Sequence, residues 1–437
     1  MRDLCIIGAG IVGSALAYEA SAYHLDTVVL EKELDVALGA SRANNAIIHA
    51  GYAAPAGSAM ARYNVLSAKQ MPELSRRLGF DYKECGSLLL SLDEADDAIL
   101  QKFFEQGQLN GVEGLEFWDE SCCAHKLPKL GRRIRKALFA PHSGVVNPWD
   151  YVLAFSQVAL REGVDFCLDH EVLNIEKIDG GYRIRTNHET IESRYVINAA
   201  GPESGVMHEL VTNEEVPIEL NKSNYYLIED KQVQAPDRIL FECANLSGRG
   251  VLIAPTVGGR MLIGANSEIV KRRPGKRMPL ETIREKVKVL MPELPEDYPV
   301  RQFTGYRLGL DGSDDFVLGF ADEGFYDVAA ICSPGLSAAP AMAQEIIQTI
   351  VKDCLKASRK QDWDGTRSPI RSCEQENLGS KDSLAQRIFR RDESVTPEEI
   401  REAIHQGLRV SALDWVAPRA GVKAGHCEGG LCGCKKK

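Results

Sequence analysis

Short apolar runs alternate with stretches of helical character along most of the chain, and this pattern predicts a mixed α/β protein. Residues 3–8 form an apolar strand, a glycine turn and a small-residue helix follow, and a second apolar strand ends at Glu31. Residues 65–80 and 94–110 are predicted to be helical, and the continuous apolar run 86–92 is typical of a buried strand. The chain therefore opens with a strand-helix-strand unit.

The middle of the chain is predicted to be rich in sheet. Strands are expected within 161–201 (the last over 194–201), and over 222–229, 250–254 and 260–264. Residues 327–351 then predict a strand, a Ser-Pro-Gly turn and a long helix with a face of small residues. The polar stretch 357–385 is predicted to be a linker. It precedes a small segment, 386–437, with one helix whose Thr396 and Glu399 have capping-box spacing.

Composition and charge narrow the class of protein. The chain has 437 residues, which predicts two or three domains at roughly 100–200 residues each. Its net charge of −10 does not suggest a nucleic-acid partner, and an anionic substrate would need local cations. The N-terminus is a strand rather than a signal peptide, and no apolar stretch approaches the length of a membrane span, about 20 residues. We expect a cytoplasmic protein with no transmembrane segment.

Cysteine usage agrees with a reducing compartment. Nine of the twelve cysteines are scattered with no metal or disulfide spacing, so we expect reduced, buried thiols. The other three, Cys427, Cys432 and Cys434, crowd into the sequence HCEGGLCGC near the C-terminus and need a separate explanation.

The first strand-helix-strand unit carries a dinucleotide-binding fingerprint. Gly8, Gly10 and Gly13 form G-x-G-x-x-G between strand and helix, and Glu31 follows 18 positions after Gly13. The glycines serve a tight turn, close approach of backbone to pyrophosphate, and close helix–strand packing. The helix N-terminus then faces the diphosphate, and Glu31 accepts from ribose hydroxyls.

This fingerprint alone is compatible with NAD or FAD. Two features favour FAD: the fingerprint starts at residue 8, and the strand ending in INAAG resembles a second FAD-contact strand of large flavoproteins. The turn SPGL at 333–336 precedes a helix whose positive end is expected to face the flavin.

Residues 1–355 resemble the D-amino-acid-oxidase-like superfamily of FAD enzymes, nearest to glycerol-3-phosphate oxidases and dehydrogenases, with L-2-hydroxyglutarate oxidases next. The motif S-x-x-N-S-x-x-I-H-x-G of those families stands here as Ser41 to Gly51. A G-K/R-G stretch matches Gly248 to Gly250, and later family positions match Arg307 and Ser333. Asn45 departs from the pattern, because the related position is often serine.

The resemblance implies a role for each matching residue. His49 is the base that takes the hydroxyl proton while hydride passes to flavin N5, a task suited to the imidazole pKa. Arg249, Arg307, Ser333 and Asn45 face a small anionic substrate. The expected FAD contacts are Gly8, Gly10, Gly13, Glu31, Ser41, Arg42, Asn44, Val172, Gly201, Gly335 and Leu336. Without the resemblance, His49 and Val172 would be read as core residues and the arginines as surface charges.

Residues 386–437 resemble a bacterioferritin-associated-ferredoxin-like domain that binds a 2Fe–2S cluster through four thiolates. Cys427 and Cys432 match the second cysteine pair, but Arg390, Arg391 and Asp392 stand where the first pair should be. We therefore expect a degenerate domain without a cluster and no resident metal. A zinc site through the three C-terminal thiols and His426 is a weaker alternative.

Together these observations predict an α/β fold (α+β overall) with a Rossmann-like FAD-binding domain, an inserted mixed-sheet substrate domain and a small helical C-terminal domain. The predicted ranges are 1–80, 145–215 and 305–356 for the FAD domain, 81–144 and 216–304 for the substrate domain, 357–385 for the linker, and 386–437 for the last domain.

The predicted function is oxidation of a small anionic secondary alcohol, sn-glycerol 3-phosphate to dihydroxyacetone phosphate. The alternatives are a 2-hydroxy acid such as L-2-hydroxyglutarate, or a non-catalytic electron-relay flavoprotein subunit. A partner flavoprotein or electron-acceptor subunit is a further expectation.

Overall fold

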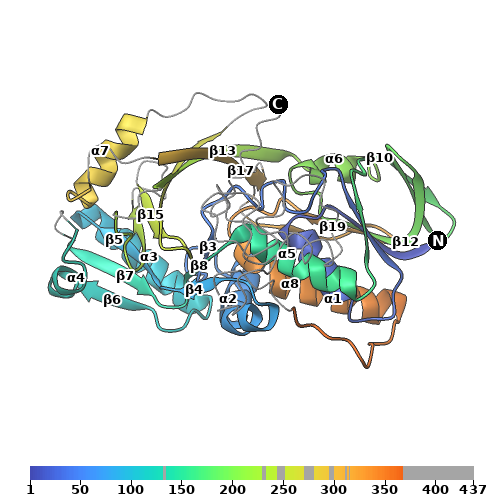
Figure 1. Ribbon diagram of the computed structural model, residues 1–437, viewed down its shortest axis with the longest axis horizontal. Helices are drawn as coiled ribbons and strands as arrows, with labels where there is room; N and C mark the ends of the chain where they lie inside the picture. Colours follow the sequence, from blue (N-terminus) through green and yellow to red (C-terminus); the bar gives the residue numbers. More distant parts are fainter. Residues whose placement is uncertain are drawn as a thin grey trace, which may run out of the picture.

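Two large sheets, each with its own set of helices, organise the molecule (Figure 1). The structure is a computed structural model that describes residues 1–130, 134–228, 233–243, 251–269, 280–294, 300–310, 313 and 315–367. All structural statements below concern these residues. The predicted C-terminal domain and its helix lie outside them.

The first sheet has a parallel centre built from strands far apart in the sequence. Its central order is β9-β2-β1-β12-β19, and all four pairings are parallel. The bounds are Asp165–Leu168 for β9, Thr27–Glu31 for β2, Arg2–Ile7 for β1, Thr190–Asn198 for β12 and Phe325–Ala329 for β19. Antiparallel strands β10 (Val172–Ile178), β11 (Gly181–Thr186) and β18 (Val317–Asp322) extend it.

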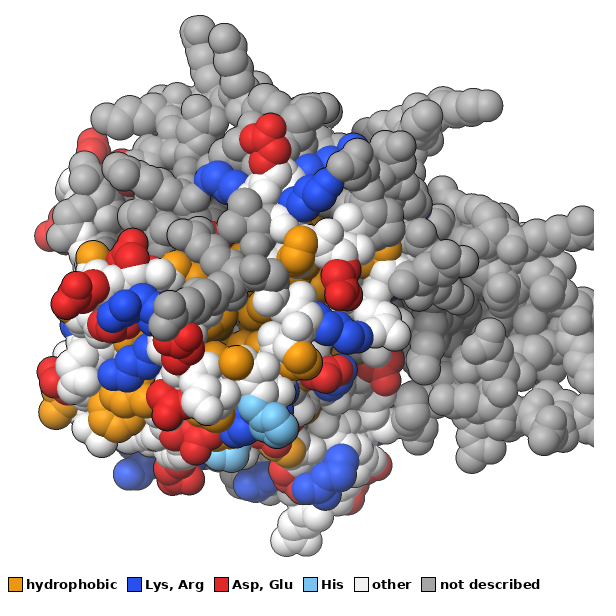
Figure 2. Space-filling model, turned by 90° about the vertical axis from the view of Figure 1, so that its left-hand side faces the viewer, with side chains coloured by type: hydrophobic (Ala, Val, Ile, Leu, Met, Phe, Trp, Pro, Cys, Tyr) orange, Lys and Arg blue, Asp and Glu red, His pale blue; other side chains and the backbone are white. Residues whose placement is uncertain are grey.

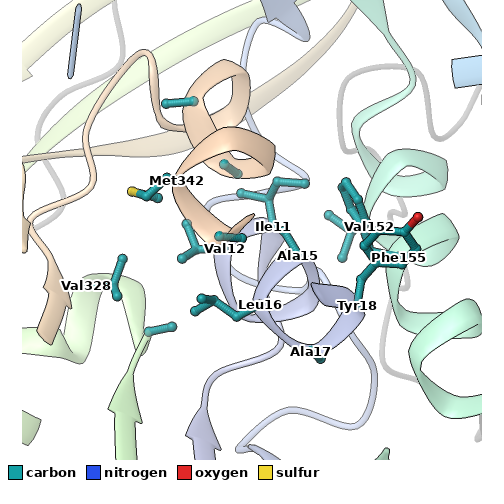
Figure 3. Close-up of a cluster of buried hydrophobic side chains, with 14 of the residues drawn as sticks. Ile11, Val12, Ala15, Leu16, Ala17, Tyr18, Val152, Phe155, Val328 and Met342 are labelled. Carbon is teal, nitrogen blue, oxygen red and sulfur yellow. The ribbon is translucent and has the colours of Figure 1, made fainter. Parts of the chain in front are cut away.

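Helix α1 (Ile11–Ala20) packs between α5 (Pro148–Arg161) and α8 (Gly335–Thr349) against this sheet. All but one of its ten residues are buried, because small residues such as Ala15 and Ala17 let two helices approach closely. In Figure 3, Val12 and Leu16 point toward the side of Met342 and Val328, and Tyr18 points toward Phe155. A helix buried nearly all round is expected at the centre of a layered fold.

The second sheet is mixed. Its order is β17-β13-β16-β15-β14-β5-β7-β6, and β14 runs parallel to β5 while the other neighbours are antiparallel. The bounds are Val300–Leu310 (β17), Ile218–Ile228 (β13), Met261–Ile269 (β16), Leu252–Pro255 (β15), Ile239–Glu242 (β14), Ser87–Ser91 (β5), Lys136–Ala140 (β7) and Glu116–Asp119 (β6). Helices α3 (Glu94–Leu109), α4 (Glu120–Lys126) and α7 (Leu280–Leu290) accompany this sheet (Figure 1).

The end of the molecule that carries α4 and α7 is shown in Figure 2. Over the described part of this face, Lys and Arg side chains are interspersed with Asp and Glu, and hydrophobic side chains gather near the middle. In the described part of the chain, the structure contains no helix with both the length and the apolar character needed to cross a membrane.

A small sheet and helix α2 lie between the two large sheets. The small sheet pairs β8 (Gly144–Val146) with β3 (Ile47–Ile48) and β4 (Tyr82–Glu84). Helix α2 (Ala59–Leu78) is capped by Ser58, whose side chain accepts from the N–H of Ala61. The carboxylate of Asp315 accepts from the first two N–H groups of the helix, those of Ala59 and Met60, both at 2.9 Å.

We expect Asp315→Ala to lower the free energy of unfolding by about 1–2 kcal/mol, because two N–H groups at the positive end of α2 lose their acceptor. Urea titration followed by circular dichroism measures the change. Asp315→Asn keeps one acceptor oxygen and should lose less. Equal losses for the two variants would show that the carboxylate does not act as a cap.

Residues 357–367 pack against helices α1 and α5 of the first sheet. The hydroxyl of Tyr18 donates to the carbonyl of Gly365 at 3.0 Å, and the indole N–H of Trp363 donates to Ser21 at 3.0 Å. The buried Arg367 bonds Gln157 at 2.6 Å and pairs with Asp150 at 2.8 Å. The polar composition predicted a linker here, but this first part of it is packed, because its polar groups bond to α1 and α5.

The fold class is confirmed: a Rossmann-like unit joins a mixed second sheet. The predicted helices 65–80 and 94–110 correspond to α2 and α3, although α2 begins six residues earlier, at Ala59. The predicted strands at 86–92, 194–201, 222–229, 250–254 and 260–264 correspond to β5, β12, β13, β15 and β16. The remaining short elements are the turn η1 (Gly201–Glu203), α6 (Ser204–Glu209) and a π-helical turn at Ile350–Leu355 after α8.

Candidate active site

A cavity of about 940 Å³ lies between the first sheet and the second and is lined by residues of both. At one end it is lined by the turns after β1, β2 and β12, and at the other by residues of β13, β14 and β17. This size is at the upper end of the range for small-molecule sites. The residues in the cavity wall that the sequence predicted are Gly8, Gly10, Glu31, Ser41, Asn44, Asn45, His49, Val172, Gly201, Arg307, Ser333, Gly335 and Leu336.

Two predicted residues that the structure describes, Gly13 and Arg42, do not line the cavity. Gly13 lies beneath the glycine turn, where it contributes packing rather than a cavity surface. Arg42 is half-buried on the predicted cofactor segment but does not line the cavity. Arg249 lies outside the described residues, as do Cys427 and Cys432.

The glycine turn after β1 leaves no room for side chains. Gly8 has a φ of 101°, and a Cβ there would lie 2.5 Å from the carbonyl oxygen of Ala199. A Cβ on Gly13 would lie 1.8 Å from the carbonyl oxygen of Gly8, so only glycine lets α1 sit this close to the turn. The backbone is thus exposed at the point where a diphosphate would approach it.

Hydrogen-bond donors and the carboxylate of Glu31 lie at this end of the cavity. Helix α1 is fully described; its first turn carries no acidic side chain, and Ser41 accepts from the N–H of Ile11 at 2.9 Å. Glu31, at the end of β2, accepts from the N–H of Ala9 at 2.7 Å. Burial raises the pKa of the Glu31 carboxyl, and this hydrogen bond opposes the shift. A positive helix end beside an acid suits a diphosphate and a ribose.

The segment after this turn is shaped by its asparagines. The amide of Asn44 donates to the carbonyl of Ser41 at 2.7 Å, and its side-chain oxygen accepts from the N–H of Ala46 at 2.8 Å. Asn45 accepts from the N–H of Ile47 at 3.3 Å. Such side-chain bonds to nearby backbone are the usual role of asparagine in loops. They hold Ala46 at a φ of 59°, just before the short strand β3 that leads to His49.

His49 is fixed by its backbone, which leaves its ring to the cavity. Its N–H donates to Ser337 of α8 at 2.9 Å, and its carbonyl accepts from the side chain of Asn64 in α2. The ring stacks on Phe241 of β14, with 6.0 Å between ring centres. Among the described residues, its ring nitrogens have no hydrogen-bond partner. Burial, and then the positive charge of Arg307, lower the pKa of His49 to about 4, so the imidazole is neutral at physiological pH.

Arg307 provides the positive charge at this end. It stands on β17, and among the described residues no carboxylate pairs with it. Gly305 on the same strand brings Arg307 toward His49, because a Cβ there would lie 1.7 Å from the carbonyl oxygen of Ala43. Ser333, on the turn before α8, lines the same cavity. A guanidinium, a hydroxyl and a neutral imidazole therefore share one chamber.

Sequence reasoning missed several wall residues in this chamber. Ser223 and Tyr225 of β13, Phe241 of β14 and Tyr306 of β17 all line it. Only 222–229 was predicted as a strand, and the alternation of its side chains would have placed Ser223 and Tyr225 on one face. The strands of Phe241 and Tyr306, β14 and β17, were not predicted. Nothing in the sequence indicated that this face meets His49.

The glycine turn, the carboxylate of Glu31 at the end of β2, and a chamber with a neutral imidazole beside a guanidinium are typical of one class of protein, an oxidoreductase with a dinucleotide cofactor. The chain belongs to the FAD dependent oxidoreductase family, whose sequence pattern matches residues 3–349. The cavity fits FAD on its own terms, since Gly8 and Gly10 present bare backbone to it beside the N-terminus of α1, where the diphosphate is expected.

Relatives of known activity have similar sequences and structures. A glycerol 3-phosphate dehydrogenase of Caloramator mitchellensis is 34% identical, over 99% of this chain and 92% of its own length. The human mitochondrial L-2-hydroxyglutarate dehydrogenase is 30% identical over 63% of this chain and 63% of its own. The structure of L-α-glycerophosphate oxidase from Mycoplasma pneumoniae, reduced with dithionite and with FAD bound, superposes with a TM-score of 0.78 at 25% identity, over 84% of this chain and 99% of that one.

We expect Gly305→Ala to impair the chamber more than FAD binding. The new Cβ would collide with backbone at Ala43 and force β17, with Arg307, away from His49. FAD content, measured by absorbance after gel filtration, should stay within twofold of wild type, while flavin reduction by substrate slows at least tenfold. Gly259→Ala is the control for backbone strain: a Cβ there meets no atom within 4 Å, and the cost of alanine at its φ of 81° falls on stability in the β15–β16 turn, outside the cavity. Wild-type reduction by Gly305→Ala would contradict the expected clash.

Proposed function

We propose that this FAD-dependent oxidoreductase converts sn-glycerol 3-phosphate to dihydroxyacetone phosphate. The observation that carries the proposal is that Arg307, which has no carboxylate partner among the described residues, lines the same cavity as the neutral His49. The family match and the glycerol 3-phosphate relatives support it. Bound FAD supplies the acceptor for the hydride that leaves C2 of the alcohol.

His49 is the proposed base. Oxidation of a secondary alcohol removes a hydroxyl proton together with the C–H hydride, and a neutral imidazole accepts that proton. The lowered pKa keeps the ring unprotonated before substrate binds. The phosphate of the substrate then partly neutralises the field of Arg307, so the ring becomes a stronger base when it is needed. Phe241 supports the ring from one side.

The phosphate is proposed to bind Arg307, with Ser333 as a second donor. A guanidinium presents a planar fork of N–H groups that matches phosphate oxygens, and a hydroxyl adds one further hydrogen bond. Arg249 and Asn45 stay part of the proposed substrate site from the family resemblance. Asn45 lines the cavity and holds the turn before His49.

A second candidate substrate is L-2-hydroxyglutarate or another 2-hydroxy acid. The similarity to the human L-2-hydroxyglutarate dehydrogenase favours it, and a carboxylate fits Arg307 as well as a phosphate does. An amine or imino acid has less need of a histidine base.

The deciding experiment is anaerobic. The purified holoprotein is mixed with either glycerol 3-phosphate or L-2-hydroxyglutarate, and loss of the flavin absorption near ~450 nm is followed, a property of the cofactor itself. Rapid bleaching by glycerol 3-phosphate alone supports the proposal. Bleaching by the hydroxy acid alone moves the assignment to the second candidate. Stable colour with both substrates overturns both assignments.

The route of the electrons follows from the C-terminal sequence. If residues 386–437 hold no cluster, reducing equivalents pass directly to oxygen, a quinone or a partner flavoprotein. We also propose a cytoplasmic location, which is supported by the free thiols of all eight described cysteines.

A further inference from the structure

A second group of chemistry-bearing side chains lies at the edge of the first sheet, outside the chamber. Cys167 of β9, His170 after it and Glu189 on the β11–β12 turn place one ligand atom each within 4.8 Å of the others. Strands β10 and β12 mark this end of the molecule on the right of Figure 1. Cys167 and His170 are three positions apart in the sequence, and the fold brings Glu189 to them.

The tautomer of His170 is set by its surroundings. Its Nδ1 lies 2.8 Å from the carbonyl oxygen of Leu168, so this nitrogen is the donor. In the neutral ring Nε2 then carries the lone pair, yet it lies 3.3 Å from a carboxylate oxygen of Glu189. Two acceptors at this distance repel unless a proton or a metal ion lies between them. Metal-bound histidines usually donate their other N–H to a carbonyl or carboxylate in this way.

The two chain segments are held together before any ion binds. Asn187 on the β11–β12 turn donates to the carbonyl of Asp169 at 3.0 Å and accepts from the N–H of Glu171 at 2.9 Å. Cys167 and His170 are half-buried, and Glu189 is exposed and open to solvent.

We propose that Cys167, His170 and Glu189 form a zinc site, with a water molecule completing the coordination. Zinc takes thiolate, imidazole and carboxylate ligands together, at bond lengths of about 2.0–2.3 Å. A tetrahedron with those bonds separates its ligand atoms by roughly 3.3–3.8 Å, which the group reaches by small side-chain rotations. On binding, the thiol proton is released to solvent and no electron is transferred.

The site adjoins the cofactor end of the cavity. The N–H of His170 donates to the carbonyl of Glu31 at 2.8 Å, and that of Asp169 donates to the carbonyl of Glu33 at 2.9 Å. His170 and Val172 also line the cavity. Bound zinc would therefore link the β11–β12 turn to the loop between β9 and β10, whose backbone bonds to Glu31 and Glu33.

The test measures zinc retained by the full-length holoprotein. Chelator-treated protein is incubated with excess zinc, passed through gel filtration and analysed by mass spectrometry for zinc per chain. Cys167→Ser and His170→Gln should each hold one zinc fewer than wild type. Cys122→Ser removes a half-buried thiol elsewhere and should equal wild type. Because Cys427, Cys432 and Cys434 also offer thiols, the series is repeated with all three changed to serine, and the difference should persist.

Cobalt gives a second readout. In the visible and near-ultraviolet spectrum, a thiolate-to-cobalt band should appear in wild type and be absent in Cys167→Ser. Glu189→Gln, an exposed change that does not threaten folding, should weaken zinc retention at least tenfold. Equal zinc in wild type, Cys167→Ser and Glu189→Gln overturns the proposal. So does zinc that disappears only when the three C-terminal cysteines are replaced.

Discussion

Replacing His49 with alanine should slow substrate-dependent flavin reduction by about 10²–10⁴-fold, the usual contribution of a general base. The reason is that the neutral imidazole of His49 lines the same chamber as Arg307, where it can accept the hydroxyl proton of a bound substrate. FAD content should be retained, because the backbone groups of His49, not its ring, bond to α2 and α8. Stopped-flow mixing under anaerobic conditions measures the rate constant.

A control variant, His142→Ala, and the pH dependence of kcat/KM distinguish a catalytic role of His49 from a structural one. His142→Ala removes an exposed histidine that pairs with Glu84 outside the cavity, and it should keep the wild-type rate within twofold. In wild type, kcat/KM should fall as the pH drops through the His49 pKa of about 4. This acid limb should vanish in His49→Ala. A slow variant that keeps the wild-type limb would show that His49 only positions its neighbours.

Replacing Arg307 with methionine should raise the KM for glycerol 3-phosphate about 30-fold or more. Loss of one partner of a buried, hydrogen-bonded charge pair costs about 2–5 kcal/mol; Arg307 is exposed in the structure, so the lower end applies, and about 1.4 kcal/mol corresponds to tenfold. Arg307→Lys keeps the charge without the planar fork and should recover part of the loss. Arg301→Met, on the same strand but away from the cavity wall, is the control. An unchanged KM would place the phosphate elsewhere.

Arg307→Met should also shift the acid limb of the kcat/KM profile to higher pH. The charge of Arg307 disfavours protonation of His49, so it contributes to the lowered pKa after burial. Without it the pKa of His49 rises toward its ordinary value, and activity should be lost at a higher pH than in wild type. The acid limb of kcat/KM, recorded for Arg307→Met and Arg307→Lys, tests this. A downward shift would contradict the expected direction.

Local sequence signals predicted the cofactor half of the fold well, because strand, glycine turn, helix and acid are contiguous between residues 2 and 31. The second half of the site depends on long-range pairing. Arg307 reaches His49 only because β17 pairs with β13 and Gly305 touches Ala43, more than 250 residues apart in the chain. No periodicity encodes that meeting, so family resemblance was needed to select Arg307 among the cations.

The packed segment 357–367 shows the opposite limitation. Its polar composition predicted a linker, whereas Arg367 finds Asp150 and Trp363 finds Ser21 only in the folded molecule. The triad of Cys167, His170 and Glu189 escaped prediction for the same reason, since two hairpins bring it together. The partners of polar residues are set by tertiary structure, whereas the periodicity of apolar residues predicts only whether a segment is a helix or a strand.

The cavity draws its two ends from different sheets, and this division separates two kinds of evolutionary change. Substitutions on β13, β14 and β17 alter the chamber around Arg307 without touching the glycine turn or Glu31. A lineage can therefore exchange one oxidisable metabolite for another while its nucleotide cradle stays under unchanged selection. For protein engineers the same boundary marks out a compact library, Ser223, Tyr225, Phe241 and Tyr306, in which specificity is open to redesign at little risk to cofactor retention.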